Sequence, residues 1–228
     1  MDCLFSGKMR LADLVSANGN LILMLPRFGI PLGFGDSRVS EVCARYGIPE
    51  DFFLLIANVY TFGHYIPDQD QIGSTDMQRL VPYLQASHDY YLHSRLQHIG
   101  THLEDLARAV DHKHGQLLES FFEGYQKEVK EHFAYEEQTV FPYIAQLQAG
   151  RQPGSYRIAE FKASHCDIDD KLADLTQILY KYLPGNHLPD ETIDLIFDIS
   201  ILSADLVKHQ LIENKILIPY VELLEQAL

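Results

Sequence analysis

One segment of the chain occurs twice, and this repeat constrains the fold more than any other feature. His132-Phe-Ala-Tyr-Glu136 returns as His209-Gln-Leu-Ile-Glu213, and each copy is followed by a Pro-Tyr-aliphatic sequence. An offset of 77 residues separates the two copies, and the same offset relates His88 to His165. The repeated unit is therefore one His followed, 44 residues later, by His-x-x-x-Glu.

The spacing within the unit predicts that its polar side chains converge. Residues four apart on an α-helix lie on one face, so each His-x-x-x-Glu pair can point at a single place. A helix pair that occurs twice predicts a four-helix bundle with a pseudo-two-fold axis. Near that axis we expect four imidazoles and two carboxylates: His88, His132, Glu136, His165, His209 and Glu213.

This ligand set fits a pair of metal ions, each held by two imidazoles and both bridged by the two carboxylates. Imidazole binds several transition metals, whereas bridging carboxylates favour hard ions such as iron or manganese, so the mixture fits iron best. A single His-x-x-x-Glu pair is usually a surface hydrogen bond. Six such residues that repeat at one offset favour a dinuclear site. Octahedral iron would keep vacant positions for O₂, NO or peroxide, unlike a closed structural site.

Composition excludes several other classes of function. The formal net charge of −14 argues against nucleic acid as a partner, because phosphate binding needs Lys and Arg. No apolar run reaches the length of a membrane span, and the first residues do not resemble a signal peptide. Cys3, Cys43 and Cys166 form neither a zinc motif nor a disulfide framework, which fits a cytoplasmic protein. A homodimer is compatible with the sequence.

The first part of the chain, residues 1–62, is predicted to be a small helical domain. Apolar residues recur at helical spacing over residues 9–28, and this pattern predicts one helix that ends at Gly29. Further helices are expected up to Tyr46 and from Phe52 to Tyr60. A linker is predicted over residues 63–73, which contain Gly, Pro and several polar residues.

The second part, residues 74–228, is predicted to be the helical bundle. Its first helix begins after Ser74 or Thr75 and runs to about Val110, and Asp111–Gly115 is predicted as a turn. The second helix begins near Leu117 and should kink or end at Pro142, which lacks an N–H group. The third carries His165 and ends at Tyr182; the last begins at Asp190.

The repeat and its ligands resemble the hemerythrin-like bundles, and the whole chain is similar to the di-iron proteins that repair damaged iron–sulfur clusters (the repair-of-iron-centres family). The run Glu136-Glu-Gln-Thr-Val-Phe-Pro142 is typical of that family. The resemblance covers nearly all of the chain. It implies a di-iron centre, oxo-bridged when oxidised, with the six residues above as ligands. It also implies a role in cluster repair or in the response to nitric oxide and oxidative stress, with apo iron–sulfur proteins as partners.

Two departures from the family leave an alternative open. The N-terminal cysteine pair of the family falls at Gly33 and Phe34, so its redox or cluster-handling role does not carry over. This loss favours an O₂- or NO-binding sensor or carrier that signals through its N-terminal domain. The second departure concerns two histidine positions that follow the first bundle helix in family members. Val110 stands at the first of these positions here, and His114 fits the second.

Other polar residues near the repeat are not assigned to the site. His112 and His114 are left out because a helix end lies far from the middle of a bundle. His93 is expected in a surface contact, since it points to a different face from His88. Asp169, four residues after His165, remains an alternative oxygen ligand. No catalytic residue is assigned.

Overall fold

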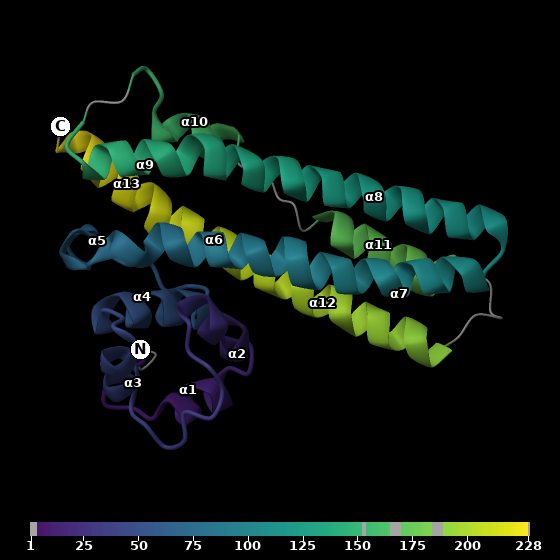
Figure 1. The fold of residues 1–228 in the computed structure, drawn as a ribbon, viewed down its shortest axis with the longest axis horizontal. Helices are drawn as coiled ribbons and strands as arrows, with labels where there is room; N and C mark the ends of the chain where they lie inside the picture. The colour runs from purple at the N-terminus through teal and green to yellow at the C-terminus, as the bar shows by residue number, and fades with distance from the viewer. Residues whose placement is uncertain (1–3, 152–153, 165–169, 184–188, 228) are drawn as a thin grey trace. The chain divides into compact units, whose positions relative to one another are not determined.

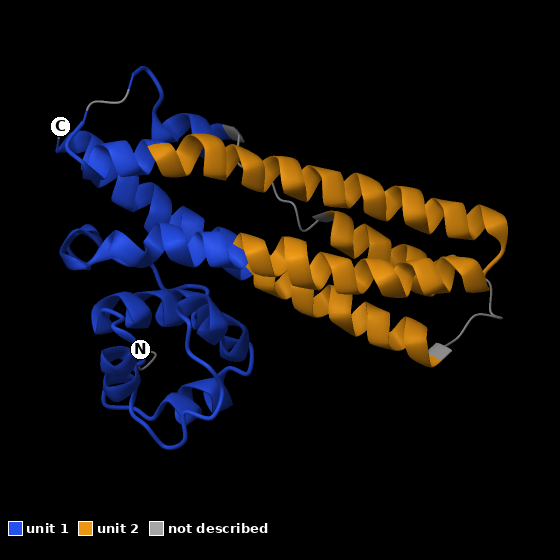
Figure 2. Ribbon diagram, in the orientation of Figure 1, with its two compact units in different colours: residues 1–87, 143–163, 208–228 blue, residues 88–142, 164–207 orange. Residues whose placement is uncertain are grey.

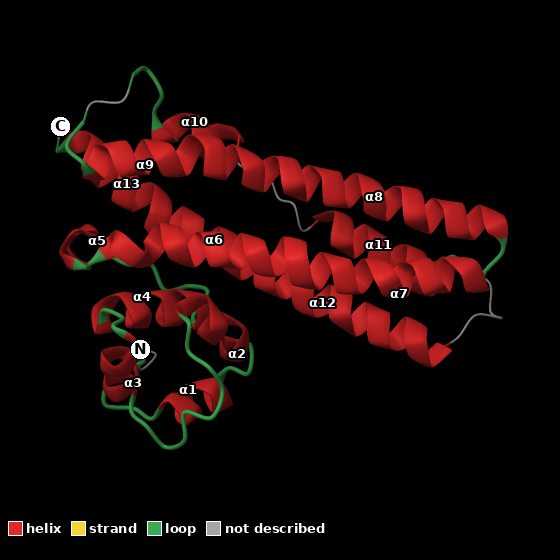
Figure 3. Cartoon of the chain, in the orientation of Figure 1, coloured by secondary structure: helices red, strands yellow, loops and turns green. Residues whose placement is uncertain are grey.

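The computed structural model describes residues 4–151, 154–164, 170–183 and 189–227. The regular elements in these ranges are helices, apart from an isolated bridge between Arg10 and Arg38 (Figure 3). The all-α prediction is therefore confirmed. Among the described helices, none is both long and apolar enough to cross a membrane.

The chain divides into two compact units (Figure 2). Unit 1 comprises residues 1–87, 143–163 and 208–228, and unit 2 comprises residues 88–142 and 164–207. Each unit is thus built from segments that are far apart in the sequence. The predicted boundary around residues 63–73 between an N-terminal domain and a bundle stays a prediction.

Unit 1 begins with short helices, of which α2 (Leu21–Met24) and α3 (Val39–Tyr46) contact α4 (Glu50–Thr61) (Figure 1). Apolar side chains occur on nearly every face of α4, and most of its residues are buried. Phe28 places its ring 5.8 Å from that of Phe52 and 5.1 Å from that of Phe53. The elements here are α1 (Leu11–Ala17), α2 (Leu21–Met24), the 3₁₀ turn η1 (Leu25–Phe28), α3 (Val39–Tyr46) and α4 (Glu50–Thr61).

The single helix predicted over residues 9–28 is wrong, because it is broken between α1 and α2. Asn18 has an extended backbone with φ −144°, and its side-chain oxygen accepts a hydrogen bond from the N–H of Asn20 at 3.1 Å. Asn side chains compete in this way with helical hydrogen bonds. The apolar periodicity continues across the break, which is why it concealed the turn.

The predicted linker also contains regular structure that the sequence reading missed. Helix α5 (Gln69–Ser74) begins after Asp68, whose side chain accepts from the N–H of Gln71 at 2.8 Å. A 3₁₀ turn, η2 (Met77–Arg79), follows, and α6 (Leu80–Tyr90) begins six residues after the predicted Ser74. Asp68 is a common type of N-cap residue, so the sequence carries a signal for this helix within the polar run that predicts a linker.

Unit 1 also contains α9 (Phe141–Gln148), α10 (Ile158–Ser164) and α13 (Ile218–Gln226). The carboxylate of Glu225 on α13 joins them. It accepts hydrogen bonds from the Tyr143 hydroxyl at 2.5 Å and from the Ile158 N–H at 2.8 Å. Burial and this carboxylate raise the pKa of Tyr143 to about 12, so its hydroxyl stays a donor.

In unit 2, long helices pack side by side around an apolar core (Figure 1). Arg95 and His98 both contact the carboxylate of Asp198, at 2.8 and 3.0 Å, and so link the first helix to the last. The helices are α7 (Leu96–Ala109), α8 (His112–Tyr135), α11 (Asp170–Lys181) and α12 (Pro189–Ile212). The core includes Tyr91, Leu103, Leu118, Phe122, Tyr125, Phe133, Leu175, Leu195 and Ile199.

The turn predicted at Asp111–Gly115 is wrong beyond its first residue. Asp111 is the N-cap of α8, and its side chain accepts from the N–H groups of Lys113 and His114, both at 3.2 Å. The helix therefore begins at His112 rather than near Leu117. Gly115 lies so close to α7 that an added Cβ would be 2.5 Å from the carbonyl oxygen of Ala107.

In the part of the chain that the structure describes, three π-helical turns interrupt the long helices: η3 (Tyr91–Arg95), η4 (Glu136–Val140) and η5 (Glu213–Leu217). In η4 the Phe141 N–H donates to the carbonyl of Glu136, and in η5 the Ile218 N–H donates to the carbonyl of Glu213. The backbone distortion thus repeats at the offset of the sequence. Single π turns within α-helices are frequent at functional sites.

The helix neither ends at Pro142 nor needs to, since it continues as α9 to Gln148. Pro142 is the second residue of α9, directly after η4. A missing N–H is tolerated in the first turn of a helix. The sequence predicted a kink or an end at Pro142, and the end is wrong because the π turn restarts the hydrogen-bond pattern just before the proline.

Candidate metal centre

Glu136 and His132 form the first half of the site, where α8 meets η4. They lie four residues apart, so one turn of helix brings them together. The Nε2 atom of His132 is 2.8 Å from Oε1 of Glu136. The Glu136 side chain is fully buried, whereas the His132 side chain keeps 10% of its surface exposed.

His88, near the end of α6, approaches the same carboxylate from another helix. Its Nε2 atom is 3.0 Å from Oε2 of Glu136, and the side chain is buried. Each oxygen of Glu136 therefore faces a different imidazole. The ring of His88 is nearly parallel to that of Phe133, at 4.0 Å and 11°, and to that of Phe141, at 5.6 Å and 16°.

His209 and Glu213 form the corresponding pair in the second repeat, where α12 meets η5. The Nε2 atom of His209 is 3.1 Å from Oε1 of Glu213, and both side chains are buried. The geometry is the same as that of His132 and Glu136: one helical turn, a carboxylate at the first residue of a π turn, and Nε2 toward the carboxylate.

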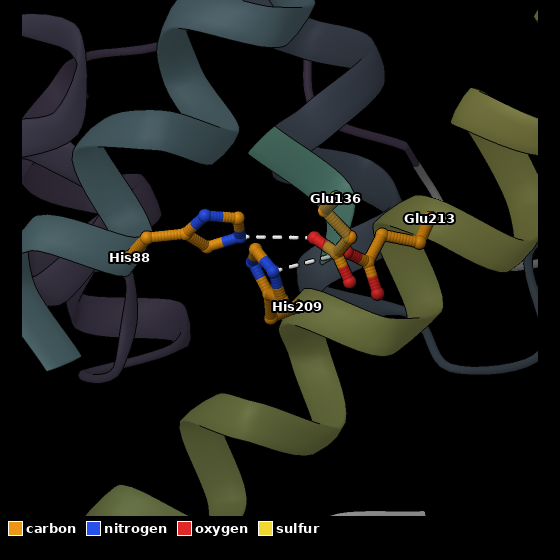
Figure 4. A group of neighbouring side chains, drawn as sticks. All are labelled: His88, Glu136, His209 and Glu213. Atoms are coloured by element: carbon orange, nitrogen blue, oxygen red, sulfur yellow. Dashed lines mark ion pairs between the residues drawn. The ribbon is translucent and has the colours of Figure 1, made fainter. Parts of the chain in front are cut away.

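The two halves supply one group of possible metal ligands (Figure 4). His88, Glu136, His209 and Glu213 each offer a ligand atom, and these four atoms lie within 4.8 Å of one another. All four residues are buried. Burying carboxylates is costly unless a cation or hydrogen bonds compensate, and imidazole nitrogens with carboxylate oxygens are suitable ligands for transition metals. The residues present therefore fit a bound cation.

The remaining predicted ligands have different outcomes. His132 contacts Glu136, as described above, although it is not one of the four residues of that group. His165 lies outside the described residues, as does the alternative ligand Asp169. The prediction that all six residues bind metal therefore stays a prediction.

The histidines left out of the site lie away from it. His93 is 70% exposed and makes only a loose contact with Asp89, at 4.0 Å. His114 pairs with Asp111 at 2.6 Å in the first turn of α8. The helical rise puts His114 about 27 Å along the helix from His132.

Glu137 is a contact of the site that the sequence reading missed. Its Oε1 atom is 2.9 Å from Nδ1 of His88, on the opposite edge of the ring from Glu136. The Glu137 side chain is 42% exposed. The Glu-Glu pair in the sequence was a possible signal, but nothing in the sequence says which imidazole the second carboxylate meets.

The comparisons agree with this geometry. Residues 91–222, more than half of the chain, match the family model described as the hemerythrin HHE cation binding domain. The matched range contains both His-x-x-x-Glu pairs and begins three residues after His88. No curated protein and no solved structure matched the chain. With a buried His/Glu metal-ligand cluster at the repeated positions, the chain belongs to the hemerythrin HHE cation-binding family.

Proposed function

We propose that this chain is a non-haem di-iron protein. The observation that carries the proposal is the buried group of His88, Glu136, His209 and Glu213, whose ligand atoms lie within 4.8 Å of one another. Two carboxylates in such a group favour hard cations, and the imidazoles favour transition metals, which together point to iron. In this proposal His132 and His165 complete the set, so that each repeat supplies two imidazoles and one carboxylate.

The two glutamates act as bridges in this proposal. Glu136 supports the role because its two oxygens face different imidazoles, at 3.0 Å from His88 and 2.8 Å from His132. Both carboxylates begin a π turn, so the backbone presents them in equivalent ways. A bound iron pair would supply redox chemistry and open positions for O₂, NO or peroxide. The protein contributes the charge that holds two cations together and a buried environment.

The role that we favour is iron–sulfur cluster repair, or another part of the response to nitric oxide and oxidative stress. It is supported by the resemblance of nearly the whole chain to the repair-of-iron-centres family. In this role the protein donates iron to an apo iron–sulfur protein. The partially exposed His132 supports it, since it is the ligand candidate with the most solvent contact among those described.

A second candidate role is an O₂ or NO sensor or carrier. It is favoured by the absence of the family's cysteine pair, at Gly33 and Phe34, and by one contact of the second repeat. Lys215, two residues after Glu213, donates hydrogen bonds to the main-chain oxygens of Gly63 and, at 3.0 Å, Tyr65. A change in the turn that carries Glu213 would therefore reach the segment that follows the N-terminal helices.

The two roles are separated by what the iron-loaded protein does. We would measure iron transfer to an apo ferredoxin supplied with inorganic sulfide and a thiol reductant and, in parallel, the reversibility of NO binding from the optical spectrum. Iron transfer that restores the ferredoxin spectrum supports repair, whereas reversible NO binding without loss of iron supports sensing or carriage. Protein that contains no iron after expression in iron-supplemented medium would contradict the di-iron proposal itself.

A further inference from the structure

Glu137 contacts the one edge of His88 that does not face the proposed metal. Nε2 of His88 points to Glu136, in the ligand group, and Nδ1 lies 2.9 Å from the Glu137 carboxylate. A neutral imidazole carries a proton on one nitrogen and a lone pair on the other. If Nδ1–H donates to Glu137, the lone pair is on Nε2, where a metal can accept it.

The contacts of His88 give Glu137 a part in this choice that the stacked rings cannot take. The rings of Phe133 and Phe141 lie nearly parallel to the imidazole and fix its plane. Stacking does not distinguish the two orientations related by a half-turn of the ring, because both place the imidazole in the same plane. A hydrogen-bond acceptor beside Nδ1 does distinguish them, since the half-turn would replace the N–H by a C–H.

From this geometry we infer that Glu137 is a positioning residue for the metal site. It holds His88 in the tautomer and orientation that direct Nε2 to the metal. The carboxylate also makes the imidazole a stronger donor to a cation, as partners of metal-bound histidines generally do. This inference rests on the proposed metal-binding function and names a residue that works through His88 rather than as a ligand.

The two repeats differ at this position. Asn214 stands 77 residues after Glu137, so the second repeat has an amide where the first has a carboxylate. Duplication alone therefore does not account for the acid at position 137. Solvation of an exposed carboxylate does not explain Glu137 either. Its side chain is 42% exposed, yet it contacts an imidazole that is almost completely buried.

The test is the affinity of the whole chain for Co²⁺. It is measured in competition with a chelator, and the optical spectrum of the bound Co²⁺ is the readout. Loss of such a partner weakens metal binding by roughly 10- to 100-fold in other sites. We expect a loss of that size for Glu137→Ala, with an altered Co²⁺ spectrum. Glu137→Gln keeps a hydrogen-bond acceptor but loses the charge, so its Co²⁺ affinity should lie between those of the wild type and Glu137→Ala. The matched control is Glu131→Ala, an exposed carboxylate on the same helix, which should bind like the wild type.

Two further measurements separate positioning from a general effect on the fold. The metal-free variants should melt at the wild-type temperature, and the effect of Glu137→Ala should disappear in a His88→Ala background. The inference is overturned if Glu137→Ala binds Co²⁺ as tightly as the wild type, or if its loss persists without His88. In either case the proposed metal site is not contradicted, provided that the wild-type protein binds Co²⁺. A wild-type protein that binds no metal would contradict both.

Discussion

Replacing Glu136 by glutamine should change stability in opposite ways with and without metal. The side chain is fully buried, and its two oxygens face His88 and His132. Glutamine keeps the size and one oxygen acceptor but removes the negative charge. A buried carboxylate is costly when no cation compensates its charge, and the uncharged glutamine removes that cost from the metal-free protein. The metal-free variant should therefore melt at or above the wild-type temperature.

With metal bound, the same change should be costly. A ligand present at 100 times its dissociation constant stabilises the folded state by about 2.7 kcal/mol. If the loss of the bridging charge weakens binding 100-fold, the gain at the same metal concentration falls to about 0.4 kcal/mol. For a domain of this size each kcal/mol corresponds to about 2–4 °C. The wild type should then gain about 5–11 °C, and Glu136→Gln about 1–2 °C.

The assay is thermal unfolding followed by circular dichroism, under anaerobic conditions, with Fe²⁺ or with a chelator. Glu131→Gln is the matched control, because it makes the same chemical change on the same helix at a side chain that is 67% exposed. It should gain as much from metal as the wild type. The reasoning is refuted if Glu136→Gln gains as much as the control, or if neither the wild type nor the control gains at all.

Three other predictions concern residues outside the proposed ligand set. Gly115→Ala should lower the free energy of unfolding by about 1–2 kcal/mol in chemical denaturation, since overpacking against the Ala107 carbonyl exceeds the helix-propensity gain; equal or higher stability would contradict the close approach. Lys215→Met should speed hydrogen exchange in the segment after the N-terminal helices, because it loses two hydrogen bonds to main-chain oxygens there; unchanged exchange would contradict this. Asp198 is partly buried, which raises its pKa, but Arg95 and a neighbouring imidazole outweigh this and hold it below its usual value. The Asp198 carboxylate therefore stabilises the fold at pH values above its unfolded-state pKa. This contribution is lost as the pH falls through its folded-state pKa. Asp198→Asn should flatten the fall in melting temperature over that acidic range.

The sequence predicted which residues lie together at the site better than it predicted the helices that carry them. The repeat offset predicted that His88, Glu136, His209 and Glu213 lie together, and the structure places one atom of each within 4.8 Å of the others. Residues that must meet in space keep their spacing while other residues diverge. The offset could not show the π turns at Glu136 and Glu213. A π turn moves one hydrogen bond by one residue and needs no particular residue type, so composition carries no trace of it.

The errors elsewhere arose where local side-chain contacts overrode a longer pattern. Apolar periodicity predicted one helix over residues 9–28, but the Asn18 side chain bonds the following backbone and breaks it. The polar run after position 110 suggested a turn, but Asp111 caps a helix there. The contact between Glu137 and His88 joins residues 49 positions apart, and only the packing of the helices brings them together.

The most direct test of the account is the amount of iron bound per chain in the wild type, Glu136→Gln and Glu213→Gln. The account predicts about two irons per chain in the wild type, because two buried carboxylates hold two cations close together, as in other two-metal sites. Each glutamine variant should lose most of this iron, and the two should resemble each other because the residues are equivalent in the repeat. If both variants keep the full wild-type iron content, the glutamates are not bridges. The proposed dinuclear centre would then be wrong, even if the histidines bind metal.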